Sequence, residues 1–277
     1  MELVRKPLLS RVFFWLAIFV VMVYFMTPII WLVSTSFKNF IDAFALPPKI
    51  IFKPTMENYA RVLGNADFLR YMLNSIVIAA SSTAICLLLG VPAAYAVGIF
   101  EFKRKNDFSF LVLSLRIAPP IMSLLPMYII FSNLSLIRTK VPLIFMYTLM
   151  NLPLAIWILP VYFRDIPREL YEAAIIDGCG EFFAFARIML PLARGGIAAT
   201  TILCFMNAWN EFLYALVLSG GPNQTLPVAV TSFMTFQGTQ WGSMSAAGTI
   251  IMLPMLVFAT FVQKYFAKGM TLGAVKG

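Results

Sequence analysis

Between two apolar segments the chain carries the stretch EAAIIDG at residues 172–178, followed by IMLP at residues 188–191. Good helix formers precede Gly178, and they predict a short helix of about three turns. Asp165 can cap the start of this helix with its carboxylate, and Pro167 fits a first turn that needs no amide donor. Gly178 can end the helix, because glycine adopts a reversed backbone that a side chain resists. A polar, ordered loop therefore joins two very hydrophobic segments.

A second short helix is predicted over residues 181–190. Pro191 should end it near the fifth apolar segment, because proline disfavours the helical conformation of the residue before it. The two helices together form a compact projection that can enter a cleft of a partner. The alternative is an amphipathic helix lying on the membrane surface. Such a helix would not require this combination of Glu, two Ala, Gly and a distant Leu-Pro.

The composition is that of an integral membrane protein. Hydrophobic residues make up 61% of the chain and charged residues only 12%, so most of the surface must face lipid or other helices. The apolar runs are about 20 residues or longer, which at about 1.5 Å per residue matches a hydrocarbon core of roughly 30 Å. The alternation expected of membrane strands does not occur. We therefore expect an all-α fold with six membrane-spanning helices, at residues 12–33, 72–100, 108–131, 141–163, 196–218 and 246–266.

Lysine and arginine residues gather at alternate ends of these predicted spans. The formal charge of +9 would by itself suit a nucleic-acid-binding protein. The cations, however, precede span one, separate spans two and three, fill the loop 164–195 and close the chain, whereas residues 219–242 hold none. The positive-inside rule assigns these four groups to the cytoplasm. We therefore expect both termini and the loop in the cytoplasm, one transmembrane domain over residues 1–277, and no nucleic-acid partner.

Two segments on the opposite side are candidates for contact with an external partner. Residues 39–70 mix turn residues with short amphipathic pieces, which predicts a structured loop. Its cations are tolerated there because translocated charge counts less away from the helix ends. The second segment precedes the last span, and an ordinary turn at the membrane surface explains it about equally well. Its residues are Gln237, Gly238, Thr239 and Gln240.

The sequence offers no evident site for a metal or a nucleotide. It has no histidine and three isolated cysteines, which are better explained as small buried hydrophobes than as ligands of zinc, haem or an iron–sulfur cluster. No glycine is followed by lysine, so the phosphate-binding GxxxxGK[ST] loop is absent. We expect this chain to bind no cofactor. Energy from a nucleotide would have to come from another subunit.

The stretches at 172–178 and 188–191 resemble the EAA loop in the membrane subunits of ATP-binding cassette (ABC) importers. That loop has Glu-Ala-Ala, a Gly six positions after the Glu, and then Ile-x-Leu-Pro, and every one of these positions is filled here. In that family the loop is a coupling helix that docks in a groove of a cytoplasmic ATPase and passes its closure on to the membrane helices. The resemblance implies that the ATPase contact involves Glu172, Ala173, Ala174, Asp177, Gly178, Leu190 and Pro191.

Two further stretches resemble the smaller permease of maltose-type carbohydrate importers. They are WNEFLYAL at 209–216 with TLP at 225–227, and the ending GMTLGAVKG at 269–277. One departure concerns Arg194-Gly195-Gly196, where many relatives carry a further proline, and it leaves open the angle at which span five enters the membrane.

The resemblance also implies a set of partners. They are a second, homologous but non-identical permease, two ABC ATPases that bind ATP and Mg²⁺, and an extracytoplasmic solute-binding protein, all at the cytoplasmic membrane of a bacterium or archaeon and in contact with its lipid. The loop 237–240 is expected to enter the binding protein and displace its ligand.

Charged residues inside the predicted spans are candidates for the substrate pathway. An arginine near mid-bilayer costs roughly 2.5 to 3.5 kcal/mol, so Arg116 should face the bundle or reach for the interface, and a structural role is favoured over substrate contact. Glu211 lies roughly 10 Å deeper. Pairing it with Arg116 would need a tilt, or a break at Pro119-Pro120. We expect Glu211 and Asn210 instead to form bonds within the bundle.

Trp209 is the one tryptophan that falls deep in a predicted span. Its ring could stack on a sugar face while neighbouring side chains hydrogen-bond the hydroxyl groups. Packing inside the bundle explains the same residue at least as well. The full set of pathway candidates is Arg116, Asn207, Trp209, Asn210, Glu211 and Tyr214.

The expected function is that of a non-catalytic permease subunit, which forms half of the translocation pathway of an ATP-driven carbohydrate importer. An importer for another solute, such as a glycerophosphate derivative, is one alternative. An ion-coupled secondary transporter is a second, because mid-membrane Pro, Glu and Arg residues suit such proteins. An intramembrane enzyme is disfavoured, because the chain has no histidine and no convincing pair of nucleophile and base.

Overall fold

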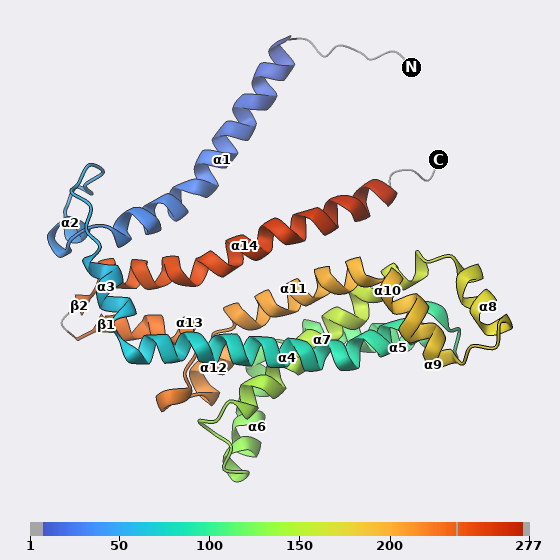
Figure 1. The fold of residues 1–277 in the computed structure, drawn as a ribbon. Coiled ribbons are helices and arrows are strands. Elements are labelled where there is room, and N and C mark those ends of the chain that lie inside the picture. The colour runs from blue at the N-terminus through green and yellow to red at the C-terminus, as the bar shows by residue number, and fades with distance from the viewer. Residues whose placement is uncertain (1–7, 237, 274–277) are drawn as a thin grey trace. The chain divides into compact units, whose positions relative to one another are not determined.

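The computed structural model describes residues 8–236 and 238–273, which are almost entirely helical (Figure 1). Gln237, part of the expected contact loop, lies outside the described residues, as do residues 1–7 and 274–277 at the two termini. The chain packs as two compact units, one from residues 1–65 and 230–252 and the other from residues 66–229 and 253–277. The single transmembrane domain stays a prediction.

Four helices in the described part of the chain are long and apolar enough to cross a bilayer unbroken. They correspond to predicted spans one, two, four and six. Counting two bent helix pairs as one span each raises the number to six, which is the predicted number, although the second pair is Glu181–Leu192 with Arg194–Asn210 and so differs from predicted span five at residues 196–218. The four helices are α1 (Leu8–Ser36), α4 (Ala66–Ile99), α7 (Val141–Arg164) and α14 (Trp241–Gly273).

Predicted span three is broken in the middle. It consists of α5 (Lys105–Ile117) and α6 (Pro120–Asn133), which are bent by 84°. Ala118 and Pro119 between them have extended backbones, because the residue before a proline avoids the helical conformation. The sequence predicts span three as one helix, with a break at Pro119-Pro120 only as a condition for pairing Arg116 with Glu211. The structure contains this break.

Close packing of α4 on α7 forms the core of the second unit. A Cβ atom on Gly90 would lie 2.9 Å from the Cβ of Ala155, and one on Gly98 would lie 2.9 Å from the Cβ of Phe163. Two glycines eight residues apart thus let the helix backbones approach, as small residues do in membrane helix pairs. Thr148 of α7 also donates a hydrogen bond to a backbone carbonyl of α4, at 3.3 Å.

Predicted span five is also interrupted. It consists of α11 (Arg194–Asn210) and α12 (Leu213–Leu218), with two non-helical residues between them. A Cβ atom on Gly196 would overlap the ring of Tyr162, so glycine allows α11 to pack closely on α7. The preceding helical run Glu181–Leu192 meets α11 at 76°, which answers how the chain enters this span.

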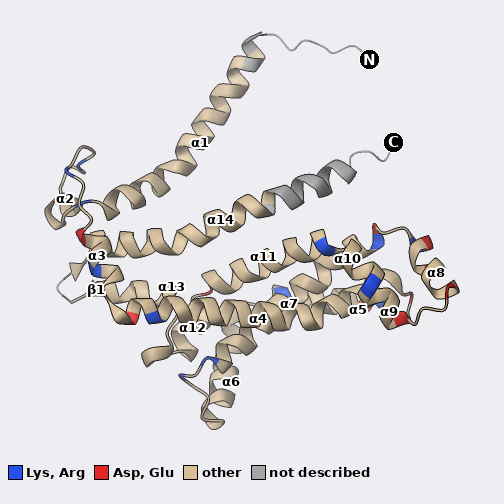
Figure 2. Cartoon of the chain, viewed as in Figure 1, with Lys and Arg blue, Asp and Glu red and all other residues tan. Residues whose placement is uncertain are grey.

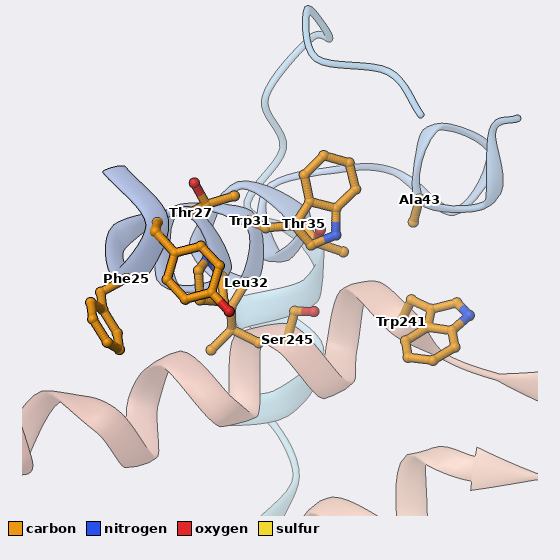
Figure 3. Close-up of a pocket in the computed structure, with 10 residues that line it drawn as sticks. Phe25, Thr27, Trp31, Leu32, Thr35, Ala43, Trp241 and Ser245 are labelled. Atoms are coloured by element: carbon orange, nitrogen blue, oxygen red, sulfur yellow. The ribbon is translucent and has the colours of Figure 1, made fainter. Parts of the chain in front are cut away.

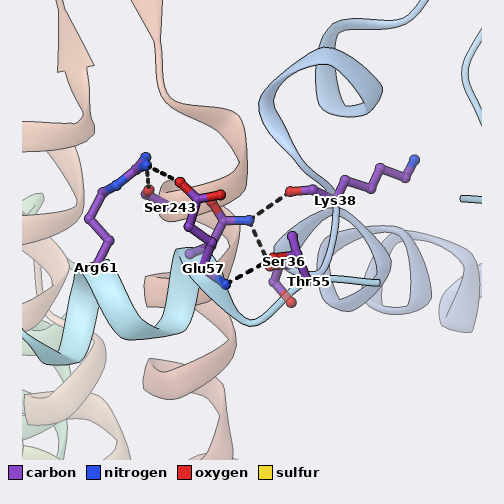
Figure 4. A network of polar contacts seen from close by, with 7 residues as sticks. Ser36, Lys38, Thr55, Glu57, Arg61 and Ser243 are labelled. Atoms are coloured by element: carbon purple, nitrogen blue, oxygen red, sulfur yellow. Dashed lines mark hydrogen bonds and ion pairs between the residues drawn. The ribbon is translucent and has the colours of Figure 1, made fainter. Parts of the chain in front are cut away.

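The first unit joins residues 39–65 to the end of α1 and the start of α14. It contains α2 (Phe40–Phe44) and α3 (Glu57–Leu63), so the structured loop predicted for residues 39–70 is confirmed, although α4 begins already at Ala66. The Asn58 amide donates to the backbone carbonyls of Ser36 and Lys38, at 2.9 and 2.7 Å. Arg61 pairs with Glu57 at 2.7 Å and reaches Ser243 of α14 (Figure 4).

The remaining short elements connect the long helices. Charged side chains gather in such segments and at helix ends, while the middles of the long helices carry few (Figure 2). The elements not yet named, apart from those between α7 and α11, are η2 (Gly221–Asn223), α13 (Leu226–Ala229), η3 (Val230–Phe233), β1 (Met234–Thr235) and β2 (Gly238–Thr239).

Candidate functional site

The predicted polar helix between spans four and five is present as α8 (Arg168–Ile176). Its end is fixed by Gly178, whose φ of +83° lies in the left-handed region. The amide of Cys179 donates to the carbonyl of Ala174, and that of Gly178 donates to the carbonyl of Ile175, both at 3.0 Å. This pair of bonds is a Schellman motif, which satisfies carbonyls at the helix end. A Cβ atom added to Gly178 would have no other atom within 4 Å. Crowding therefore does not explain the glycine, whereas its left-handed backbone conformation does.

The start of α8 differs from the expectation. Asp165 does not cap it, because this residue closes α7, with its amide donating to the carbonyl of Val161 at 3.1 Å. Pro167 occupies the N-cap position, and no side chain caps the helix. The first turn therefore relies on Glu169, whose negative charge suits the positive end of the helix dipole.

The predicted contact residues of α8 divide into two groups. Glu172 is exposed and accepts an ion pair from Arg168 at 3.0 Å, and Ala173 and Asp177 are exposed beside it. Ala174 is buried, with 5% of its surface exposed. The two alanines thus face different ways. Only Ala173 is open to another protein, and Ala174 serves the packing of this chain.

The second predicted helix runs through α9 (Glu181–Ala184), a π-helical turn at Phe185–Met189 (η1) and α10 (Leu190–Leu192). Pro191 does not end it at once, since the helix continues to Leu192. A proline has no amide to donate, and the π turn just before it is a common response to such a disturbance of the ladder. Leu190 packs against the buried core, whereas Pro191 is exposed.

An aromatic cluster that the sequence analysis missed holds this loop against the spans. The Tyr95 ring of α4 lies 4.8 Å from Phe185 of the loop and 5.4 Å from Phe163 of α7. The ring of Tyr171 on α8 lies 6.2 Å from that of Phe100. Edge-on and tilted aromatic pairs of this kind are worth about 0.5–1.5 kcal/mol each beyond burial. Aromatic residues at the ends of two spans and inside the loop were the available signal.

A cavity of about 400 Å³ lies beside the start of α8. Glu101 and Lys105 line it, 2.9 Å apart, together with Arg168. The hydrogen bond from Lys105 lowers the pKa of the Glu101 carboxyl. The loop side of the unit therefore carries several cations, in keeping with the expected cytoplasmic location.

The break in span five is stabilised by Glu211. Its two carboxylate oxygens accept the amide protons of Tyr214 and Ala215, at 2.9 and 3.2 Å. These amides begin α12 and would otherwise lack partners. The buried hydroxyl of Tyr147, which makes no hydrogen bond here, lies close to the same carboxylate. The prediction that Glu211 forms bonds within the bundle is confirmed, although its partners are backbone amides.

Tyr214 connects the two broken spans. Its hydroxyl lies 2.7 Å from the Ser123 hydroxyl and 3.2 Å from the backbone carbonyl of Pro120, at the start of α6. The side chain is buried. Tyr214 was one candidate for binding sugar hydroxyls; here its hydroxyl bonds to α6, and its place in the pathway stays a prediction.

The other residues expected around Trp209 also have partners in the bundle. The Trp209 ring is 3% exposed and stacks on Phe205 at 5.8 Å, which favours the packing alternative over a sugar platform. Asn207 donates to the side chain of Asn151 at 3.2 Å, and Asn151 donates to the carbonyl of Cys204 at 3.1 Å. These bonds join α7 to α11.

Asn210 and Arg116 are the two exposed residues among the pathway candidates. Asn210 is exposed and bonds only weakly outside its own helix, at 3.9 Å from the sulfur of Met255. Arg116 is exposed two residues before the bend of span three, and within the described chain it forms no ion pair, with Glu211 or any other residue. Among the six pathway candidates, Asn210 and Arg116 are exposed and the side chain of Glu211 is half-buried.

The expected contact loop before α14 is a β-hairpin. Met234 pairs with Thr239 and Thr235 with Gly238, and the φ of +115° at Gly238 suits only glycine. Phe236 is fully exposed at its tip. The sequence analysis did not single out this ring, although an aromatic beside a Gln-Gly turn was visible.

Comparisons with known proteins agree on one family. The family model described as "Binding-protein-dependent transport system inner membrane component" matches residues 86–272. The chain is 34% identical to the trehalose/maltose transport system permease protein MalG of Thermococcus litoralis, over 99% of both chains. It is 30% identical to the diacetylchitobiose uptake system permease protein DasC of Streptomyces coelicolor, over 99% of this chain and 100% of the relative.

A solved structure shares the fold. It is a crystal structure of a bacterial ABC transporter that imports the acidic polysaccharide alginate, and the match has a TM-score of 0.78. The alignment covers 96% of this chain and 99% of the other, at 19% sequence identity. At this identity the likeness concerns the fold alone.

The role of Glu211 predicts a separation of transport from assembly. In Glu211→Gln one of the two acceptor oxygens becomes an amide donor, which cannot accept a backbone N–H, so the start of α12 loses one bond of about 1.5–3 kcal/mol. We expect uptake to fall at least tenfold, with the subunit still inserted and assembled. Uptake assays and copurification with partner subunits measure the two quantities, and an equal loss of both would contradict this view.

Proposed function

Because the chain belongs to the family of binding-protein-dependent transport system inner membrane components, we propose that it is the permease subunit of an ABC importer for a carbohydrate. The observation that carries this proposal is the exposed α8 helix, closed by Gly178 and held to spans two and four by aromatic side chains. A helix built in this way can pass a force from a partner to the membrane helices.

The coupling step follows from this geometry. A partner ATPase binds ATP and Mg²⁺ and grips the exposed face of α8, which presents Glu172, Ala173 and Asp177. The turn at Gly178 ends α8 after nine residues and so limits the length of that face. When the ATPase pair closes, α8 moves, and Tyr171 and Phe185 carry the motion to α4 and α7 through Phe100 and Tyr95. This chain supplies the linkage and no catalytic group.

The partners are those that such an importer requires. A second, non-identical permease completes the pathway, two ATPase subunits bind on the cytoplasmic side, and an extracytoplasmic solute-binding protein delivers the substrate. The cations around α8 support a cytoplasmic location for this loop, and with six spans both termini lie on that side too.

A carbohydrate is the solute class best supported. Two relatives that align with the whole chain are named for disaccharide transport. Near the two span breaks, Asn210 offers amide groups and Glu211 and Arg116 offer charge, which suits hydrogen bonding to hydroxyl groups. Trp209 plays no part in this conformation, because its ring is buried. A glycerophosphate derivative remains the alternative solute, and Arg116 would favour it.

The hairpin between β1 and β2 is the proposed contact with the binding protein. Phe236 projects fully exposed from its tip, and a large exposed aromatic ring is typical of residues that anchor protein contacts. The hairpin would enter the opened binding protein and displace the sugar. Gly238 and Thr239 form its second strand, and Gln240 follows them.

The coupling role predicts that two variants will uncouple ATP hydrolysis from uptake. Gly178→Val forces a β-branched residue into a left-handed conformation, at a cost of about 1–2 kcal/mol, and Glu172→Lys replaces the ion pair with Arg168 by repulsion. In proteoliposomes with the complete importer, uptake should fall about tenfold or more, while the subunit stays inserted. Gly180→Ala is the matched control, because its φ of −66° and empty surroundings tolerate a methyl group. Normal coupled transport in both variants would refute the assignment.

The solute class can be identified from the native complex. We expect its binding protein to retain a neutral sugar, detected by mass spectrometry of the denatured complex, and ATP hydrolysis to rise when that sugar is added. Retention of a phosphorylated solute would support the alternative importer. Uptake that persists without ATP but collapses with the ion gradient would instead identify a secondary transporter.

The hairpin predicts a defect that depends on the binding protein. Phe236→Ser should lower binding-protein-dependent uptake severalfold, while basal ATP hydrolysis stays unchanged. Phe102→Ser is a suitable control, since that ring is also exposed but lies between α4 and α5, outside the hairpin and outside α8 and α9. Unchanged uptake after Phe236→Ser, or after deletion of residues 237–240, would remove this role.

A further inference from the structure

The first unit contains a buried lysine that the transport function does not use. Lys38 follows the end of α1 by two residues and is 1% exposed. Its ammonium lies 4.2 Å from the ring centre of Trp31 and 5.2 Å from that of Phe52. Within the described residues it makes no hydrogen bond and no ion pair. Aromatic faces attract a cation, but a buried ammonium normally also has an anionic or hydrogen-bonding partner.

The position of Lys38 is fixed by its backbone. Its amide donates to the carbonyl of Thr35 at 3.1 Å, and its carbonyl accepts from Asn58 at 2.7 Å. These bonds, with the neighbouring contacts of Figure 4, place the side chain before any ligand arrives. A change of the side chain alone therefore leaves the local fold in place.

Lys38 lines a small cavity of about 260 Å³, the Lys38 cavity, whose other walls are mostly apolar. Asp42 is the other charged residue in its wall, and its carboxylate is already paired with Lys49 at 2.6 Å. Lys49 lies outside the wall of the cavity and already compensates Asp42, so the charge of Lys38 has no counter-ion among the described residues. The cavity is therefore suited to an anion.

A larger apolar cleft adjoins this cavity. It has a volume of about 810 Å³ and shares Trp31, Ala43 and Trp241 with the Lys38 cavity. Figure 3 shows aromatic side chains of α1 facing it, and Ser245 of α14 on its other wall. The hydroxyl of Thr35, buried in the same cleft, has no hydrogen-bond partner.

The dimensions of the cleft match one leaflet of a bilayer. From Tyr24 to Thr35 the helix α1 rises roughly 16 Å, about half of the hydrocarbon thickness. Tryptophans such as Trp31 and Trp241 prefer the boundary between hydrocarbon and headgroups. The apolar cleft thus lies at acyl-chain depth, and Lys38 lies at headgroup depth.

We propose that this site binds one anionic phospholipid. Its phosphate lies at the Lys38 ammonium, and an ester oxygen accepts a hydrogen bond from the Thr35 hydroxyl. An acyl chain fills the cleft along α1. A free phosphate would use Lys38 but leave the apolar cleft empty, and a zwitterionic lipid would leave the net charge of the pocket uncompensated. The bound lipid would stiffen the junction between α1 and the outer segment.

The test uses the complete importer, purified in mild detergent and studied by native mass spectrometry with phosphatidylglycerol, phosphatidylcholine or inorganic phosphate added. We expect retention of one phosphatidylglycerol in preference to phosphatidylcholine. Lys38→Met should lower that retention about fivefold, the equivalent of about 1 kcal/mol for one lysine at a membrane surface. Lys53→Met is the matched control, an exposed lysine of the same outer segment that lines neither cavity, and it should retain the lipid.

A second variant acts on the apolar part alone. Ala43→Phe fills the wall shared by both cavities and should reduce retention even if Lys38→Met fails to assemble. Equal retention of both lipids, unchanged retention in Lys38→Met or in Ala43→Phe, or full displacement of the lipid by inorganic phosphate would overturn the proposal. So would crosslinks showing that a protein helix occupies the cleft.

Discussion

Inside the hydrocarbon core, every backbone amide and carbonyl must find a partner within the protein, because no water is there to replace one. Unbroken helices such as α4 and α7 meet most of this constraint by themselves, although Pro92 in α4 and Pro153 and Pro160 in α7 each leave one backbone carbonyl without its helical donor. Two predicted spans do not, and each needs a side chain to repair its break. Glu211 supplies acceptors to the start of α12, and the Tyr214 hydroxyl reaches the carbonyl of Pro120 across to α6.

These repairs explain why polar groups gather where the spans are broken. A carboxylate and a phenol within a membrane are costly, and both are retained here for contacts with the backbone. Discontinuous helices of this kind are where membrane transporters expose polar atoms to a solute. Asn210 and Arg116 remain exposed close in sequence to the breaks, and their contact with a substrate stays a prediction.

In the second unit, mainly apolar packing connects this region to the loop 164–195. Close glycine contacts make α4 and α7 one rigid pair, and aromatic rings fasten the loop to their ends. A rigid pair transmits a displacement, whereas a flexible pair would absorb it. The exposed face of α8 is therefore free for a partner, while its buried face, including Ala174, belongs to this chain.

The sequence by itself determined most of the spans and the α8 helix with its glycine end, and Pro119-Pro120 marked a place where span three could open, because hydrophobic length, glycine and proline act locally. Only the tertiary structure decided which side chains are free. Trp209 and Tyr214 looked like sugar-binding residues, yet one stacks on Phe205 and the other holds Pro120. Spacing along a helix gives the direction of a side chain, but its partners come from segments distant in sequence, and packing alone brings these together.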